Sequence, residues 1–143
     1  MKRILVAHDG SPSAERALRV AAGLAADRHA ELTILAVMEA SADKDLKKFG
    51  RIEHATIGDL LEQEASAILM RAKTTAMELG VREIKILAKY GDAAEIILDV
   101  AKELSPDTII ASKRGRGRLQ GLLLGSVSQK LASLAQCPVM IVP

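Results

Sequence analysis

Residues 4–18 read ILVAHDGSPSAERAL, and this stretch decides the fold class. Its first four residues are a short apolar run, which is typical of a strand buried on both faces of a parallel sheet. The HDGSPS segment has the composition of a turn, in which Ser11 or Ser13 can accept hydrogen bonds from the first N–H groups of a helix. Pro12 suits the first turn of that helix. The stretch therefore predicts a strand, a tight turn and a helix that ends near His29.

The same alternation continues along the chain. Apolar runs predict four further strands, at 31–37, 84–88, 108–111 and 139–142. Helical periodicity predicts three further helices, at 60–79, 93–104 and about 125–135. Alternating strands and helices predict an α/β fold, a five-stranded parallel sheet with helices on both faces in a Rossmann-like arrangement.

The composition fits one domain that spans 1–143. Phe49 and Tyr90 are its two aromatic residues, so the core must be aliphatic, and base stacking with single-stranded nucleic acid is disfavoured. Residues 39–58 are charged and mixed, with Gly50 and Gly58 inside, and they predict a long variable excursion, part-helical in one interpretation, that is the best candidate for a mobile flap.

Two short segments bear on location. The first apolar run has four residues, too few for a signal peptide or a membrane span, so a cytoplasmic protein is expected. Cys137 is the one cysteine, which excludes a disulfide framework, and its apolar surroundings predict a structural thiol.

Ligands of such sheets bind at the carboxyl ends of the strands, where the strand order reverses. Two loops have suitable chemistry: residues 8–11 after the first strand, and residues 112–126 after the fourth. The second loop reads SKRGRGRLQGLLLGS, with four basic residues and four glycines. Residues 105–143 carry five basic side chains and one acidic one, a local positive charge that suits a small anion better than a long polyanion.

Three known patterns do not explain the 112–126 loop. It contains no Gly-Lys pair, so it is not a P-loop. Gly115 and Gly117 begin a dinucleotide fingerprint, but Gln120 occupies the last glycine position. The glycines spaced by four lack the apolar span of a membrane helix. What remains is mechanical: small residues allow close approach, and a helix N-terminus at Gly125 would face an anion. A plain surface loop with solvated arginines is the alternative interpretation.

The whole chain, 1–143, resembles the universal stress protein family in its single-domain form. Nucleotide-binding members carry G-x2-G-x9-G-[S/T] after the fourth strand, and Gly115, nine residues, then Gly125-Ser126 fit the second half. The first glycine position is Ser112, a departure from the pattern. Further landmarks that resemble the family are residues 4–11, 91–93, 107–111 and 137–139. The resemblance implies a fold of the adenine nucleotide alpha hydrolase type.

The resemblance also implies a site for ATP between the loops after strands one and four. Asp9 would lie near the ribose and phosphates, with Mg²⁺ nearby. Ala7 and His8 would line the base or sugar, and the backbone of Val37 would meet adenine. The phosphate side would be formed by Ser112, Arg114, Gly115, Arg116, Gly125, Ser126 and Val127, with Arg118 adding positive charge.

Four functions stay open on these residues. The first is an ATP-binding regulatory protein of the stress response. The second is an enzyme, but the residues show no nucleophile and base of triad type, so at most slow ATP hydrolysis is expected. The third is a dimeric universal stress protein that does not bind nucleotide because Ser112 replaces glycine. The fourth, RNA binding through residues 113–118, is disfavoured by the missing aromatics. The resemblance implies a homodimer through the short strand at 139–142, whose free edge could pair with a second copy.

Overall fold

The computed structural model describes residues 1–39, 57–113 and 124–143. Its strands are β1 (Arg3–His8), β2 (Glu31–Met38), β3 (Ile84–Tyr90), β4 (Thr108–Ser112) and β5 (Val139–Val142). They form one sheet in the order β3-β2-β1-β4-β5, and every neighbouring pair is parallel. The predicted five-stranded parallel sheet is therefore confirmed.

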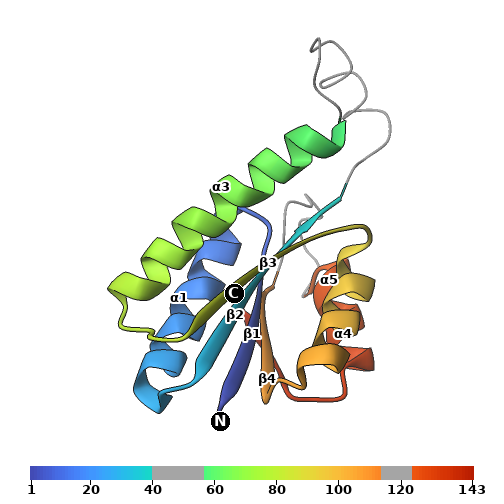
Figure 1. The fold of residues 1–143 in the computed structure, drawn as a ribbon. Helices are drawn as coiled ribbons and strands as arrows, with labels where there is room; N and C mark the ends of the chain where they lie inside the picture. The colour runs from blue at the N-terminus through green and yellow to red at the C-terminus, as the bar shows by residue number, and fades with distance from the viewer. Residues whose placement is uncertain (40–56, 114–123) are drawn as a thin grey trace.

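Helices cover both faces of this sheet (Figure 1). The four helices of the described residues are α1 (Pro12–Arg28), α3 (Ile57–Glu78), α4 (Ala93–Leu104) and α5 (Ser126–Leu134). The buried residues of α1 and α3 belong to one apolar cluster, and those of α4 and α5 belong to a second cluster on the other face. Central strands contribute to both clusters, because successive side chains of a strand point to opposite faces.

Local signals in the sequence account for several helix ends. The Ser11 Oγ accepts a hydrogen bond from the Ala14 N–H at 3.1 Å, and α1 ends at His29 in the left-handed conformation. Asp92 caps α4 by accepting from the Glu95 N–H at 3.0 Å. Both carboxylate and hydroxyl caps satisfy N–H groups that have no acceptor within the helix.

Two predicted bounds were wrong. Helix α3 begins at Ile57, so Gly58 lies within a helix and not in the predicted excursion. A glycine weakens a helix without ending it, and its weight as a break was overestimated. Strand β3 continues through Tyr90, beyond the predicted end at residue 88, because its pairing with β2 extends to Met38. The rest of the excursion lies outside the described residues.

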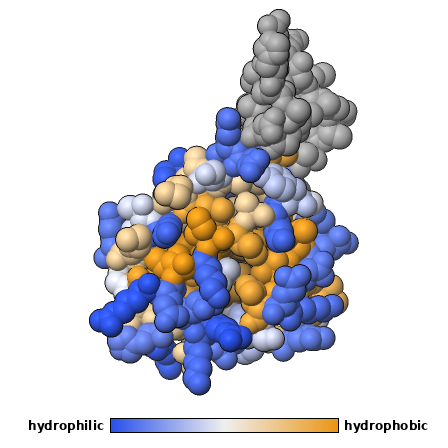
Figure 2. Space-filling model, viewed as in Figure 1, coloured by the Kyte–Doolittle hydropathy of each residue, from blue (hydrophilic) through white to orange (hydrophobic). Residues whose placement is uncertain are grey.

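Strand β3 differs from the buried strands because it lies at a free edge of the sheet. Ile86 and Tyr90 are 38% and 44% exposed, and Lys85 and Lys89, which precede them directly, are exposed as well. Figure 2 shows apolar residues gathered at the centre of this view, with hydrophilic residues around them. Lysines on an edge strand discourage pairing with other chains.

The cysteine lies beside β5. Cys137 is a free, partly buried thiol that packs against the α4 and α5 cluster. Burial raises its pKa, so the fraction of reactive thiolate is low. This agrees with the structural role predicted for it.

Candidate functional site

The strand order places the two candidate loops next to each other. β1 pairs with β2 on one side and with β4 on the other. Helix α1, which follows β1, covers one face of the sheet, and α5, which follows β4, covers the other. The carboxyl ends of β1 and β4 therefore flank the point where the strand order reverses, which is where ligands of such sheets bind. The fold thus brings the two loops together at this point, and the ligand site itself stays a prediction.

The turn between β1 and α1 is held by its own side chains. His8 Nδ1 accepts a hydrogen bond from the Gly10 N–H at 3.0 Å. Asp9 Oδ1 accepts one from the Ser11 N–H at 2.8 Å. Gly10 has a φ of 86°, a conformation that glycine adopts without a steric penalty. Two successive hydrogen bonds thus define the turn, and in each a backbone N–H donates to the side chain two residues earlier.

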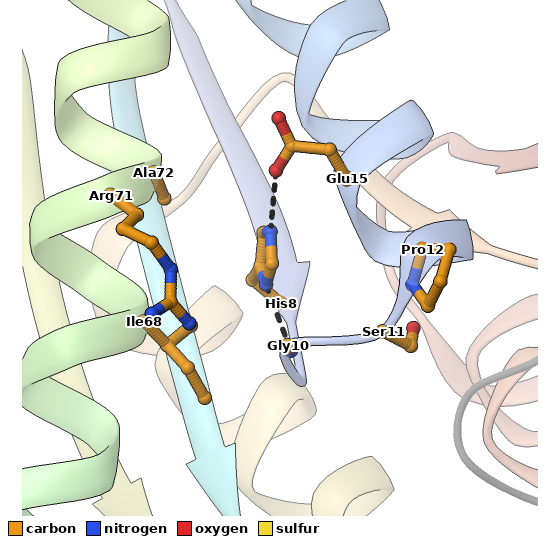
Figure 3. Close-up of a pocket in the computed structure, with 8 residues that line it drawn as sticks. All are labelled: His8, Gly10, Ser11, Pro12, Glu15, Ile68, Arg71 and Ala72. Carbon is orange, nitrogen blue, oxygen red and sulfur yellow. Dashed lines mark hydrogen bonds and ion pairs between the residues drawn. The ribbon is translucent and has the colours of Figure 1, made fainter.

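Ala7 and His8 point to opposite faces of the sheet, although both were predicted to line the base or sugar. Ala7 packs against the cluster on the α4 and α5 face. His8 is 6% exposed and lines a pocket of about 220 Å³ between α1 and α3 (Figure 3). Adjacent residues of a strand cannot face the same layer, and the sequence does not say which of the two faces the ligand.

Val37 lies in β2, one residue beyond the last residue paired with β1, which is Ala36. Its side chain is 9% exposed and belongs to the core cluster on the α4 and α5 face. A contact between Val37 and a ligand would therefore come from its backbone, and this contact stays a prediction.

Hydrogen bonds join the carboxyl end of β4 to the beginning of α5. The Ser128 Oγ donates to the carbonyl oxygens of Ser112 at 2.8 Å and Lys113 at 2.9 Å. The Gly125 N–H donates to the same Lys113 oxygen at 2.9 Å. Ser128 is 2% exposed, so these bonds are protected from water. They hold the carboxyl end of β4 against the first turn of α5.

Ser112 does not have the strained backbone that a glycine position can require. Among the described residues, His29 and Ser105 are the non-glycine residues with positive φ. Ser112 is the last residue of β4 and pairs with Val142 of β5. No left-handed penalty therefore applies to serine at this position.

Helix α5 presents an open N-terminus at the site. Gly125 is its N-cap residue, with φ −73° and ψ 168°, and glycine has no side chain with which to cap the helix. Ser126 is exposed and Val127 is half-buried. The N–H groups of the first turn have no acceptor within the helix, and they carry the positive end of its dipole. This end of α5 can receive an anion.

Three predicted site residues, Arg114, Gly115 and Arg116, lie outside the described residues. Conversely, sequence reasoning missed Ser128, whose partners are backbone carbonyls on another element. It also missed Glu15, which lies 3.4 Å from His8. Its spacing of seven residues from His8 across a predicted turn is the one signal that could have suggested this contact.

The described residues offer neither a cluster of metal ligands nor a helix that could span a membrane. Residues 1–39, 57–113 and 124–143 hold no group of three or more His, Cys, Asp or Glu that could bind a metal ion. Within the same ranges, the helices are too short or too polar to cross a membrane.

Comparison with known proteins decides the family. Residues 1–143 match the family model described as "Universal stress protein family". The chain belongs to the universal stress protein family. The universal stress protein YxiE of Bacillus subtilis (strain 168) is 38% identical over 145 residues, which cover 98% of this chain and 97% of that protein.

Solved structures of universal stress proteins share its fold. UspA from Lactobacillus plantarum is 26% identical, with a TM-score of 0.81, over 99% of this chain and 97% of that one. A universal stress protein in complex with cAMP is 26% identical, with a TM-score of 0.74, over 99% and 95% of the two chains. This universal stress protein thus shares its whole length with a relative that binds an adenine nucleotide.

Proposed function

We propose that this universal stress protein binds ATP and acts as a nucleotide-dependent regulator of the stress response. The observation that carries the proposal is the open N-terminus of α5, which the strand order places beside the Asp9 turn. An uncapped helix N-terminus favours phosphate. The related protein solved with cAMP supports the adenine nucleotide class.

The proposed ligand extends from β2 to α5. The backbone at Val37 and the Ala7 side of β1 meet the base and sugar, while Asp9 lies near the ribose and phosphates. The N–H groups of Ser126 and Val127 bind phosphate oxygens, and the Ser126 hydroxyl adds a donor. Ser112, Arg114, Gly115, Arg116 and Gly125 complete the phosphate side.

Mg²⁺ would be bound together with ATP. Asp9 is the carboxylate of the turn, and one of its oxygens accepts from the Ser11 N–H. Its chemistry fits a Mg²⁺ ion that takes its remaining ligands from phosphates and water, the usual arrangement for this ion. When bound, Mg²⁺ would neutralise phosphate charge.

A binding function is better supported than an enzymatic one. His8 directly precedes Asp9, which is proposed to lie near the phosphates. Its two ring nitrogens face Gly10 and Glu15. A general base must reach the proton that it removes. The ring is directed into the α1 and α3 face, away from the open end of α5, so ATP hydrolysis is expected to be slow at most.

Isothermal titration with ATP and Mg²⁺ tests the proposal through a pair of charge variants on α5. Ser126→Asp adds a negative charge at the N-terminus of the helix, where it stabilises the helix but repels phosphate. We expect it to weaken binding at least tenfold. Ser133→Asp adds the same charge at the other end of α5, on an exposed residue, and should leave affinity within about twofold.

The titration also separates the non-binding alternative. If Ser112 blocks the site, the wild-type protein shows no heat with millimolar ATP and Ser112→Gly restores binding. If no heat appears for either protein, nucleotide binding is excluded. We expect wild-type binding and a change of less than about tenfold for Ser112→Gly, because Ser112 carries no positive φ.

We also propose a homodimer that forms through β5. This strand lies at the other free edge of the sheet, and its Met140 is 38% exposed. Unpaired backbone groups and an apolar side chain on an edge favour pairing with a second copy. Sedimentation at micromolar concentration should give a dimer, and Met140→Lys should shift it toward monomer. A wild-type monomer would contradict the dimer without bearing on ATP.

A further inference from the structure

His8 occupies a place that the proposed function leaves unused. Its side chain is one of the few buried polar groups of the described residues, at 6% exposure. Figure 3 shows the ring between α3, which carries Ile68 and Arg71, and α1, which carries Glu15. The ring therefore lies where β1 meets α1 and α3, next to the turn that bears Asp9.

The hydrogen bond with Gly10 determines where the ring proton lies. A backbone N–H can only donate, so His8 Nδ1 must accept at this 3.0 Å contact. The ring is then neutral, with its proton on Nε2. Nε2 faces Glu15 Oε2 at 3.4 Å, which is an acceptor. The two neighbours of the ring thus require the same tautomer.

Glu15 is itself held in place by a second contact. Its other oxygen, Oε1, lies 3.6 Å from Arg19 Nε one helical turn later. Arg19 is mostly exposed, so this ion pair contributes little to stability. The ion pair does, however, orient the Glu15 carboxylate, which lies between Arg19 and the His8 ring.

The turn therefore contains two consecutive bonds of the same kind. Asp9 Oδ1 accepts from the Ser11 N–H, which is the usual bond of an Asx turn. His8 Nδ1 accepts from the Gly10 N–H with the same two-residue spacing. His8 thus performs the task of an Asx acceptor, from a ring that is anchored in the α1 and α3 face.

We infer that His8 is a positioning residue for the nucleotide site, which fixes the Asp9 turn through the Gly10 N–H. The inference rests on the proposed function. Gly10 has a φ of 86°, and without an acceptor for its N–H the turn can adopt other conformations at little cost. Asp9, between the two bonded residues, would then lose its fixed orientation toward the phosphates.

Two substitutions of His8 separate positioning from bulk packing. His8→Leu fills the pocket with an apolar side chain but removes the acceptor. It should weaken ATP binding about tenfold, which corresponds to roughly 1.4 kcal/mol. His8→Asn is smaller but can accept from the Gly10 N–H through its own side-chain oxygen. It should retain affinity within about threefold. His29→Asn, at the exposed C-cap of α1, is the control for loss of a histidine.

A measurement without nucleotide keeps the two proposals distinguishable. The ring ¹⁵N shifts of His8 should show a proton on Nε2 and none on Nδ1. The Gly10 amide should exchange slowly in wild type and His8→Asn but rapidly in His8→Leu. If these NMR results are obtained but ATP does not bind, the proposed function is wrong, although the His8–Gly10 bond is present. A proton on Nδ1 would overturn the inference even if His8→Leu does not fold, as would wild-type affinity in a folded His8→Leu.

Discussion

The first turns of α1 and α5 lie at the same edge of the sheet, yet they differ in how their N–H groups are satisfied. In α1, the Ser11 hydroxyl accepts from the Ala14 N–H, and the Asp9 carboxylate accepts from the Ser11 N–H. In α5, the N-cap is Gly125, which offers no side chain. One helix end is capped by a side chain, and the other has no side-chain cap among the residues that the structure describes.

The difference assigns the two helix ends to different tasks. The capped end of α1 holds the turn that carries Asp9 in one conformation. The Gly125 end of α5, which Ser128 ties to β4, has no side-chain cap among the described residues and can receive an anion. A phosphate site here needs both parts, because a self-capped helix competes with the ligand for its own N–H groups.

The comparison can be broken most directly by making α5 resemble α1. Gly125→Asp introduces a capping carboxylate at a residue whose φ of −73° suits any amino acid. We expect ATP affinity to fall at least tenfold, because the cap occupies the donors and repels phosphate, while stability to urea is unchanged or slightly higher. Gly125→Ala, which cannot cap, is the control. Unchanged affinity in Gly125→Asp would show that the phosphates bind elsewhere.

A second change removes the hydrogen bonds that join α5 to the end of β4. Ser128→Ala removes the hydroxyl that donates to the Ser112 and Lys113 carbonyls. Because Ser128 is buried, these oxygens lose a partner, and the free energy of unfolding should fall by about 1–2 kcal/mol. Urea denaturation measures the loss. Ser133→Ala on the exposed face of α5 should have almost no effect, and an equal loss in both variants would deny Ser128 its special role.

A third change removes the cap from α1. Ser11→Ala leaves the Ala14 N–H without its acceptor and should lower the free energy of unfolding by about 1 kcal/mol. Ser11→Asp, which restores a capping oxygen, should recover most of this loss in the same urea titration. Failure of Ser11→Asp to recover stability would indicate that the hydroxyl acts in another way.

The smallest effect is expected at the other end of the same strands, where β1 and β4 begin. Asp107 accepts from the N–H groups of Lys2 and Arg3, and these bonds hold its pKa below the ordinary value of 3.8. A lowered pKa contributes stability above the unfolded value, which is lost as the pH falls through the folded value. Wild type should therefore lose stability below about pH 3.8 more steeply than Asp107→Asn, which does not titrate. Parallel pH curves for the two proteins would contradict this.

Local signals predicted much of the fold correctly. The helical periodicity of residues 93–104 predicted the bounds of α4, and the residues of β5 were predicted without error. These features depend on neighbours within a few residues. Gly58 was misleading because the tertiary packing of a long amphipathic helix outweighs the cost of one glycine.

The site was less accessible to such reasoning. The pattern around residues 4–11 indicated a turn with Asp9 in it, but not that His8 faces α3. Ser128 gave no signal, because its acceptors are backbone oxygens that any residue at 112 and 113 would provide. Nothing local showed either contact, since both depend on which segments become neighbours after folding.

By itself, the sequence determined the α/β class, the serine cap of α1 and the two loops with ligand chemistry. These follow from the period of apolar residues and from side chains that bond their own backbone. The tertiary structure decided that β4 lies beside β1, where Ile4 pairs with Thr108, and so that the two loops meet. It also decided that His8 supports the turn from behind, because the direction of a strand's side chains has meaning only once helices cover its two faces.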